Sequence, residues 1–171
     1  MSAGFDSIDL ARFALRPGEG QRLDVETDPG ELELAGQRYV VGPDAVPVRL
    51  DLSRTAAGYA VRMRFTAHAT GPCMRCLEDA DVAVEIDARE VDQPGTDDEE
   101  LRSPYVDGDE LALGSWAHDA LSLEVPIQLL CRPDCPGLCP VCGEPLSAAD
   151  GRSHEHEREP DPRWAKLREL N

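Results

Sequence analysis

The 171-residue chain has little basic charge and almost no lysine. It contains 17 Lys and Arg against 34 Asp and Glu, which gives a formal net charge of −17, and Lys166 is its only lysine. Phosphate contacts depend on clustered positive charge, so this composition argues against general binding to DNA, to bare RNA or to an anionic membrane surface. So acidic a chain suits a basic partner instead, through an attraction that salt would screen.

Segments that would direct the chain to a membrane are also missing. No stretch approaches the roughly 20 apolar residues of a transmembrane helix. The first residues, from Met1 to Asp6, lack the basic and apolar regions of a signal peptide. We therefore expect a cytoplasmic protein. Stable disulfides are rare in that compartment, so the six cysteines indicate metal binding or thiol chemistry.

Common catalytic motifs are absent as well. The chain has no G-x-G-x-x-G, Walker A, G-x-S-x-G or H-E-x-x-H sequence. Its carboxylates are so numerous that no pair can be nominated as acid and base. His154 and His156 stand in a polar, acidic stretch, at a spacing that does not put both rings on one helix face, so we interpret them as incidental. We expect no enzymatic activity.

Three runs of alternating apolar and polar residues predict the main strands. They cover residues 46–53, 59–70 and 81–89, and a period of two sustained for so long is typical of half-buried strands. The short breaks between them favour an antiparallel meander. The predicted fold is α+β, with an antiparallel meander or barrel-like sheet, one or two short helices and a Cys-rich, zinc-ribbon-like C-terminal segment.

Shorter elements are predicted before and after the meander. Alternating residues on either side of a turn at 28–30 predict two short strands, and residues 39–41 predict another. Ser115 is placed to cap a helix that ends near residue 125. A second short helix is predicted after Asp161, where Pro162 would occupy its first position.

The chain divides into one domain and a tail. Residues 1–146 are expected to form a single α+β domain that includes the Cys-rich segment, and residues 147–171 a polar tail with the terminal helix. Within the domain, residues 92–110 are predicted to form an acidic loop. We interpret this loop either as a solvated linker or as a docking strip for an Arg- and Lys-rich partner. The candidate partner-binding residues are Asp97, Asp98, Glu99 and Glu100.

The cysteines form two C-x-x-C pairs with two more between them. Cys73 and Cys76 lie between two predicted strands, at a hairpin tip, while Cys139 and Cys142 lie in a Pro- and Gly-rich segment. A C-x-x-C pair at a tight turn lets two thiolates face one cation, and two such pairs supply a four-sulfur zinc site. Neither pair opens a helix in a βαβ unit, which argues against a thioredoxin-like redox motif.

Three zinc ligand sets are compatible with the spacing, and the sequence does not decide between them. We favour Cys73, Cys76, Cys139 and Cys142, because both pairs have the spacing that is commonest in structural sites. The alternatives use Cys131 and Cys135, either with Cys139 and Cys142 or with Cys73 and Cys76. A closed four-sulfur site would be structural, with no open position for water.

Three arginines are candidates for contact with RNA. Arg62 and Arg64 would lie on one face of a strand, and Arg75 at the hairpin tip. They would form a local basic patch on an acidic molecule. The alternative interpretation is that they pair with neighbouring carboxylates.

Three segments of the chain carry a resemblance to a known family. The first, Cys73-Met74-Arg75-Cys76-Leu77, resembles the C-x-R-C-L signature of the YceD-like family, whose members are called large ribosomal RNA subunit accumulation proteins. The run from Val125 to Gly143, with Gly-Leu-Cys-Pro-Val-Cys-Gly at its end, looks like the second element, and Asp161-Pro162-Arg163-Trp164 resembles the C-terminal element. The resemblance covers most of the chain, from about residue 8 onward.

The resemblance implies a bacterial cytoplasmic protein that is needed for normal accumulation of the 23S ribosomal RNA. No catalytic activity is carried over from the family. We expect a non-enzymatic accessory factor for biogenesis of the large ribosomal subunit, with a structural zinc ion. From the charge balance we expect it to engage a basic ribosomal protein or an assembly intermediate. The alternatives are a factor that binds RNA directly or a thiol redox protein.

Overall fold

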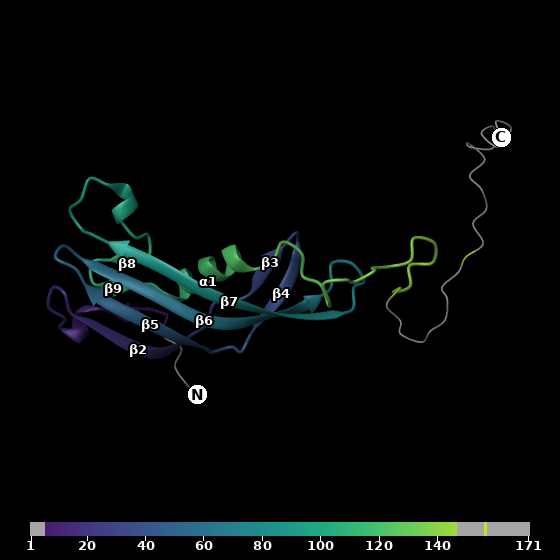
Figure 1. Cartoon of the computed structure of the whole chain (residues 1–171), viewed down its shortest axis with the longest axis horizontal. Coiled ribbons are helices and arrows are strands. Elements are labelled where there is room, and N and C mark those ends of the chain that lie inside the picture. Colours follow the sequence, from purple (N-terminus) through teal and green to yellow (C-terminus); the bar gives the residue numbers. More distant parts are fainter. Residues whose placement is uncertain (1–5, 147–155, 157–171) are drawn as a thin grey trace.

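The structure, a computed structural model, describes residues 6–146 and residue 156. A long antiparallel sheet makes up most of it, with a helix against one face and the cysteine-rich segment at one end (Figure 1). In chain order the elements are β1 (Ile8–Asp9), the 3-10 helix η1 (Ala11–Phe13), β2 (Gly20–Thr27), β3 (Leu32–Leu34), β4 (Gln37–Gly42), β5 (Val46–Arg54), β6 (Tyr59–Pro72), β7 (Asp79–Asp92), the 3-10 helix η2 (Glu99–Leu101), β8 (Val106–Asp107), β9 (Glu110–Leu111) and α1 (Leu113–Glu124).

The sheet is organised around β6, which pairs with three other strands. β7 pairs with β6 over its whole length, from Tyr59 opposite Asp92 to Pro72 opposite Asp79. The other edge of β6 is shared between two strands, with β5 opposite its first half and β4 opposite His68 and the residues next to it. β2 extends the sheet beyond β5, and β3 pairs with β4. The α+β fold and the antiparallel meander β5–β6–β7 are confirmed.

The sheet does not close into a barrel, which corrects the barrel-like alternative. Within the described residues β2 pairs only with β5, and β7 only with β6. The strands predicted around the turn at 28–30 exist as β2 and β3, but they do not pair with each other. Each joins a different partner, because hydrophobic burial against β5 and β4 outweighs the short turn between them.

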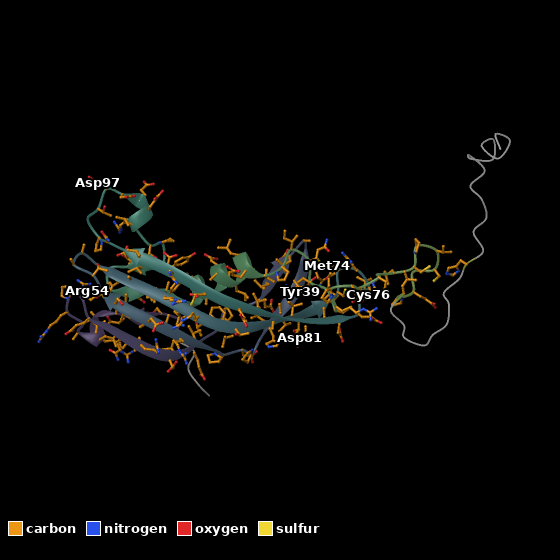
Figure 2. All side chains as sticks on the ribbon, in the orientation of Figure 1. Tyr39, Arg54, Met74, Cys76, Asp81 and Asp97 are labelled. Atoms are coloured by element: carbon orange, nitrogen blue, oxygen red, sulfur yellow. The ribbon has the colours of Figure 1, made fainter. Side chains whose placement is uncertain are left out.

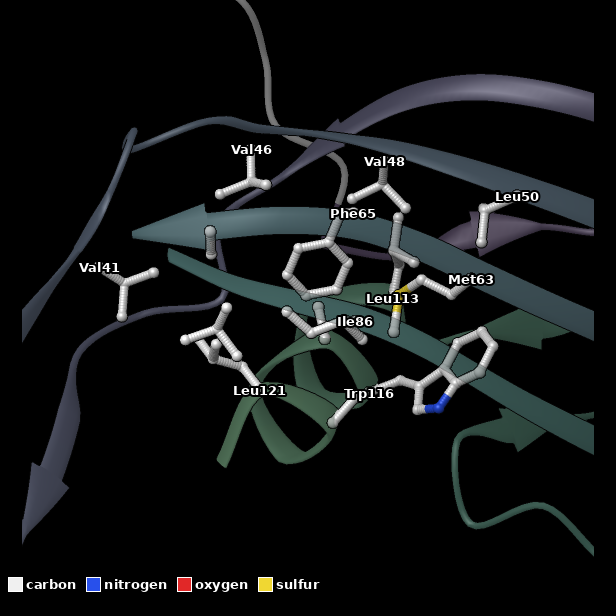
Figure 3. Packing of buried hydrophobic residues seen from close by; sticks show 14 of the residues in the cluster. Val41, Val46, Val48, Leu50, Met63, Phe65, Ile86, Leu113, Trp116 and Leu121 are labelled. Carbon is white, nitrogen blue, oxygen red and sulfur yellow. The ribbon is translucent and has the colours of Figure 1, made fainter. Parts of the chain in front are cut away.

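The core lies between the sheet and α1. Alternate residues of β5 and β6 point to this side, and Leu50, Met63 and Phe65 are almost completely buried there. Figure 3 shows them facing Trp116 and Leu121 of the helix. This is the arrangement that the period-two alternation predicts, with one face of the strands apolar and the other polar.

Helix α1 begins earlier than the sequence predicts. It starts at Leu113, after Ala112, and Ser115 lies inside the first turn instead of capping it. The early start is favoured because Leu113 is buried and because the N–H of Gly114 donates to the carbonyl of Asp6 at 3.0 Å. The helix ends at Glu124, where Pro126 follows two residues later.

The acidic loop is more ordered than a solvated linker would be. Asp92 at its start is only 3% exposed and accepts a hydrogen bond from the N–H of Ser103 at 3.2 Å. Arg102 lies 3.4 Å from the same carboxylate oxygen of Asp92. The loop also contains η2, β8 and β9. Buried Asp92 therefore closes the base of a protrusion, and Asp97 lies in its outer part, away from the sheet (Figure 2).

The predicted terminal helix and the predicted lack of a transmembrane helix can be compared with the structure only over the described residues. The helix predicted after Asp161 lies outside the described residues. Among the residues that are described, no helix is long and apolar enough to cross a membrane.

Candidate metal centre

The hairpin between β6 and β7 ends in a tight turn that presents two thiols. This first turn, Cys73–Glu78, is closed by bonds from the N–H of Cys73 to the carbonyl of Glu78 (2.7 Å) and from the N–H of Leu77 to the carbonyl of Cys73 (3.0 Å). The N–H of Arg75 points at Sγ of Cys73, 3.5 Å away. Leu77 adopts a positive φ of 62°, a conformation that glycine usually supplies. The turn holds both sulfurs on the same side.

The segment that follows α1 returns to this turn and binds to its backbone. The N–H of Met74 donates to the carbonyl of Leu129 at 2.9 Å. The guanidinium of Arg75 donates to the carbonyl of Cys135 at 3.2 Å and to the side-chain oxygen of Gln128 at 3.4 Å. Met74 and Cys76 lie at this end of the sheet in Figure 2. These bonds bring residues 128–135 against the hairpin tip.

Four thiols meet where the two segments touch. Sγ of Cys73 lies 3.8 Å from Sγ of Cys135, and Sγ of Cys76 lies 3.6 Å from Sγ of Cys131. All four sulfurs lie within 4.8 Å of one another. A tetrahedron of zinc–sulfur bonds of about 2.3 Å has sulfur–sulfur edges of about 3.8 Å. The four-thiol cluster, Cys73, Cys76, Cys131 and Cys135, therefore has dimensions that match a four-coordinate zinc ion.

This grouping differs from the ligand set that the sequence favoured. Cys73 and Cys76 lie with Cys131 and Cys135, the last of the three alternatives, while Cys139 and Cys142 lie in a separate group. The reason is the length and direction of the chain after α1. Leu129 is fully buried and bonded to the hairpin tip, so the next cysteines along the chain reach the tip first.

The surroundings shift the pKa values of three thiols in the four-thiol cluster in opposite directions. Burial raises the pKa of Cys73, but the N–H groups of Cys131, Arg75 and Cys76 outweigh burial and lower it to about 6. At Cys76 the N–H of Glu78 lowers the pKa, but burial and the neighbouring thiols outweigh it and raise it. Burial also raises the pKa of Cys131. A cation among the sulfurs would relieve this crowding of charge, since zinc binds thiolates.

Three of the four thiols in the cluster are buried, and Cys131 is partly buried. Cys73 is fully buried, and Cys76 and Cys135 are each 2% exposed. Ala80 packs against them, with Leu130 and Leu138 beside it. Four protein thiolates would leave zinc no position for water, so the arrangement suits a structural ion that joins the hairpin to the C-terminal segment.

The three arginines proposed as RNA contacts are each engaged within the protein. Arg62 binds Asp87, with Nε 2.7 Å from a carboxylate oxygen, and Arg64 binds Asp51. Arg75 is committed to the backbone contacts of the hairpin tip. The structure thus contains the pairing with carboxylates that was the alternative interpretation of Arg62 and Arg64.

The candidate docking residues are exposed. Asp97, Asp98, Glu99 and Glu100 are all on the surface, around the start of η2. Asp98 caps η2 by accepting the N–H of Glu100 at 3.1 Å. Figure 2 shows Asp97 at the opposite end of the sheet from Cys76.

His156, which the sequence analysis interprets as incidental, lies beside two cysteines in the structure. Its ring nitrogen lies within 4.8 Å of the sulfurs of Cys139 and Cys142, which form the second group. The signal in the sequence is weak, because 13 residues separate Cys142 from His156 and no regular spacing links them. No local pattern in the sequence therefore predicts that His156 lies near these two cysteines.

Comparison with known proteins agrees with the family-like segments. Residues 61–171 match the family model for the large ribosomal RNA subunit accumulation protein YceD. A protein of Mycobacterium tuberculosis described as uncharacterised is 34% identical over 172 residues, covering 96% of this chain and 80% of the relative. Another, from Mycobacterium leprae, is 32% identical over 95% of this chain and 76% of its own length. No solved structure matches the chain.

Proposed function

The chain belongs to the YceD family of large ribosomal RNA subunit accumulation proteins, and from that premise we propose that it is a non-enzymatic accessory factor for large-subunit biogenesis. In this proposal zinc bound by the four-thiol cluster stabilises the C-terminal segment, and the acidic loop engages a basic ribosomal protein. Family membership is the observation that carries the ribosomal role, since it suggests a part in accumulation of the large-subunit RNA.

The zinc part of the proposal is supported by the distances between the sulfurs. Edges of 3.6 and 3.8 Å suit tetrahedral zinc, and thiolate ligands suit this borderline-soft ion. The ion would act as a staple, because the hairpin tip and residues 131–135 come from distant parts of the chain. No step of chemistry is assigned to it.

The proposed binding of a basic protein is supported by the negative charge of the chain and of its acidic loop. The molecule carries −17 overall, and the residues 97–100 protrude as four consecutive exposed carboxylates. A basic protein would be drawn to them over the range of the Debye length, about 8 Å at physiological salt. A partner bound there would be shielded from misplaced contacts with RNA until assembly.

The test is a tagged pull-down from growing cells at low and moderate salt, with ribosomal proteins and precursor RNA both counted. The variant D97N/D98N/E99Q/E100Q removes four charges from the loop. Its control, E33Q/D44N/E85Q/E124Q, removes four exposed charges scattered over the molecule. We expect a basic ribosomal protein with the wild type and the control, at least tenfold less with the loop variant, and a steep loss as salt rises.

Two outcomes would contradict this mechanism. Equal capture by the loop variant and the control would mean that the loop is not the docking site. Recovery of large-subunit precursor RNA that survives moderate salt would favour direct RNA binding. Charge reversal at Arg62, Arg64 and Arg75 would then be the next variant, although their internal pairing argues against this outcome.

A further inference from the structure

The described part of the chain contains the same C-x-x-C turn twice. The second turn, Cys139–Glu144, repeats the bonds of the first turn, position by position. The N–H of Cys139 donates to the carbonyl of Glu144 at 2.8 Å, and the N–H of Gly143 donates to the carbonyl of Cys139 at 2.9 Å. The N–H of Val141 points at Sγ of Cys139, 3.4 Å away. Corresponding distances in the two turns differ by no more than 0.1 Å.

The backbone conformation repeats as well. Gly143 has a φ of 75°, at the position where Leu77 has 62°. The N–H groups of Glu78 and Glu144 each point at the second cysteine of their turn. Two unrelated stretches of sequence, Met-Arg and Pro-Val between the cysteines, therefore fold into one conformation that aims two sulfurs at a common point. In the first turn that point is the centre of the four-thiol cluster.

The second turn has its own third ligand. His156 brings a ring nitrogen to within 4.8 Å of both sulfurs, although it is far along the chain. The second turn shares no ligand with the four-thiol cluster, because the four sulfurs of that cluster form a separate group. Two thiols and an imidazole are a donor set that zinc and other borderline-soft divalent cations prefer over magnesium or calcium.

From this repetition we infer that the chain holds a second zinc ion, bound by Cys139, Cys142 and His156. This site is independent of the ribosomal role and of the first ion. Its three described ligands leave a fourth coordination position, open to water or an exogenous ligand. Cys142 and His156 are exposed, whereas in the four-thiol cluster three thiols are buried and only Cys131 is partly exposed. The second ion is therefore the one that exchanges readily with solution.

The second ion would also hold residue 156 against the Cys-rich segment. The N–H of Leu146 donates to the carbonyl of Gly137, and Leu138 pairs with Pro145, so the second turn sits at the tip of a small hairpin. A metal bond to His156 would fix the chain to that tip. Occupancy of this site would thereby tie residue 156 to the hairpin.

The experiment measures zinc on the reduced, full-length chain by elemental analysis, and then its release to a chromogenic chelator. We expect two zinc ions per chain in the wild type, one leaving at least tenfold faster than the other. C142S and H156A should each retain one ion and lose the fast phase. H68A is the matched control, because His68 is an exposed histidine on the sheet, paired with Asp81, and should leave both ions in place.

Replacement by cobalt separates the two sites by absorption. C142S and H156A should remove the bands of a two-thiolate site and leave those of a four-thiolate site, which C131S should abolish. Folding of each variant is checked by circular dichroism. The inference is overturned if the wild type holds one zinc that H156A leaves unchanged, or if reduced Cys139 and Cys142 bind no metal and form a disulfide on oxidation. Loss of the first ion alone would count against the proposed zinc staple and not against this site.

Discussion

The two ends of the β6–β7 hairpin are held together in different ways. At one end Gly58 and the buried carboxylate of Asp92 close the structure through backbone packing and hydrogen bonds. At the other end Cys73 and Cys76 meet thiols from a segment more than 50 residues away. The first end needs only the chain itself, whereas the second brings four thiols together in a cluster that favours a cation. Stability at the cysteine end should therefore depend on metal, and stability at the acidic end should not.

The largest expected effect comes from C131S, which removes one thiol of the four-thiol cluster. Zinc at a thousandfold excess over its Kd contributes about 4 kcal/mol to folding, and we expect the free energy of unfolding to fall by about that amount. Proteolysis should then cut within residues 126–146 while the sheet persists. Thermal melts with and without chelator check this, and C142S should keep the first ion. If chelator leaves the wild type unchanged, the cysteine end does not depend on metal.

Alanine at two glycines compares the ends directly. A Cβ at Gly58 would overlap the backbone carbonyl of Asp92, and one at Gly71 would overlap the ring of buried Tyr39. Overpacking costs about 1–3 kcal/mol and occasionally more, so we expect G58A at or above the top of that range and G71A within it. Urea denaturation measures both. G71A should also speed zinc release, because Tyr39 donates to the carbonyl of Pro72 next to Cys73. Equal zinc release in the two variants would contradict that link.

A smaller effect of opposite sign is expected from L77G. Leu77 is 67% exposed and has a φ of 62°, so its side chain contributes little packing while its backbone is strained. The left-handed conformation costs a non-glycine residue about 1–2 kcal/mol. L77G should therefore raise the free energy of unfolding by up to about 1 kcal/mol, after the entropy that glycine loses on folding. G143L should be destabilising, and a stabilising result there would refute the equivalence of the two turns.

The smallest effect concerns pH and the polar face between the two ends. The hydrogen bond from Arg22 lowers the pKa of Asp51, and that from Arg62 lowers the pKa of Asp87. Carboxyls with lowered pKa contribute stability that is complete above their ordinary value, 3.8, and that is lost as pH falls through the lowered values. Thermal melts between pH 6 and 3 should show a shallow decline, and D51N/D87N should flatten it. If stability declined with pH equally steeply in that variant, groups other than Asp51 and Asp87 would cause the decline.

Much of the fold could be predicted from the sequence, because its main strands show a regular alternation of apolar and polar residues. The alternation of β5, β6 and β7 identified those strands and the side on which Leu50 and Met63 are buried. Pairings between distant strands have no local signal, so β4 beside β6 was not foreseen. The predicted start of the helix at Ser115 was wrong, because the burial of Leu113 favours an earlier start more than a serine N-cap favours the later one.

The sequence predicted that cysteines form the candidate metal site, but not which four cysteines come together. C-x-x-C spacing specifies a turn, and both turns form. Which cysteines meet depends on the path of residues 126–135, and in particular on the bond between Met74 and Leu129. Gly143, after Cys142, readily adopts the positive φ of the second turn, whereas nothing in the sequence indicates that Leu77 adopts the same conformation in the first turn. The position of His156 beside Cys139 and Cys142 was not predictable, because no regular spacing links these residues.

The unbroken pairing of β6 with β7 also makes the hairpin a spacer. The fourteen residues of β6 are separated by thirteen steps of about 3.3 Å, so the two ends of the hairpin stand about 43 Å apart. A small domain is about 30 Å across, and one such partner cannot touch both the acidic loop and the cysteine end. The two ends are therefore free to be occupied at the same time by different molecules, held at a fixed separation by the strands between them.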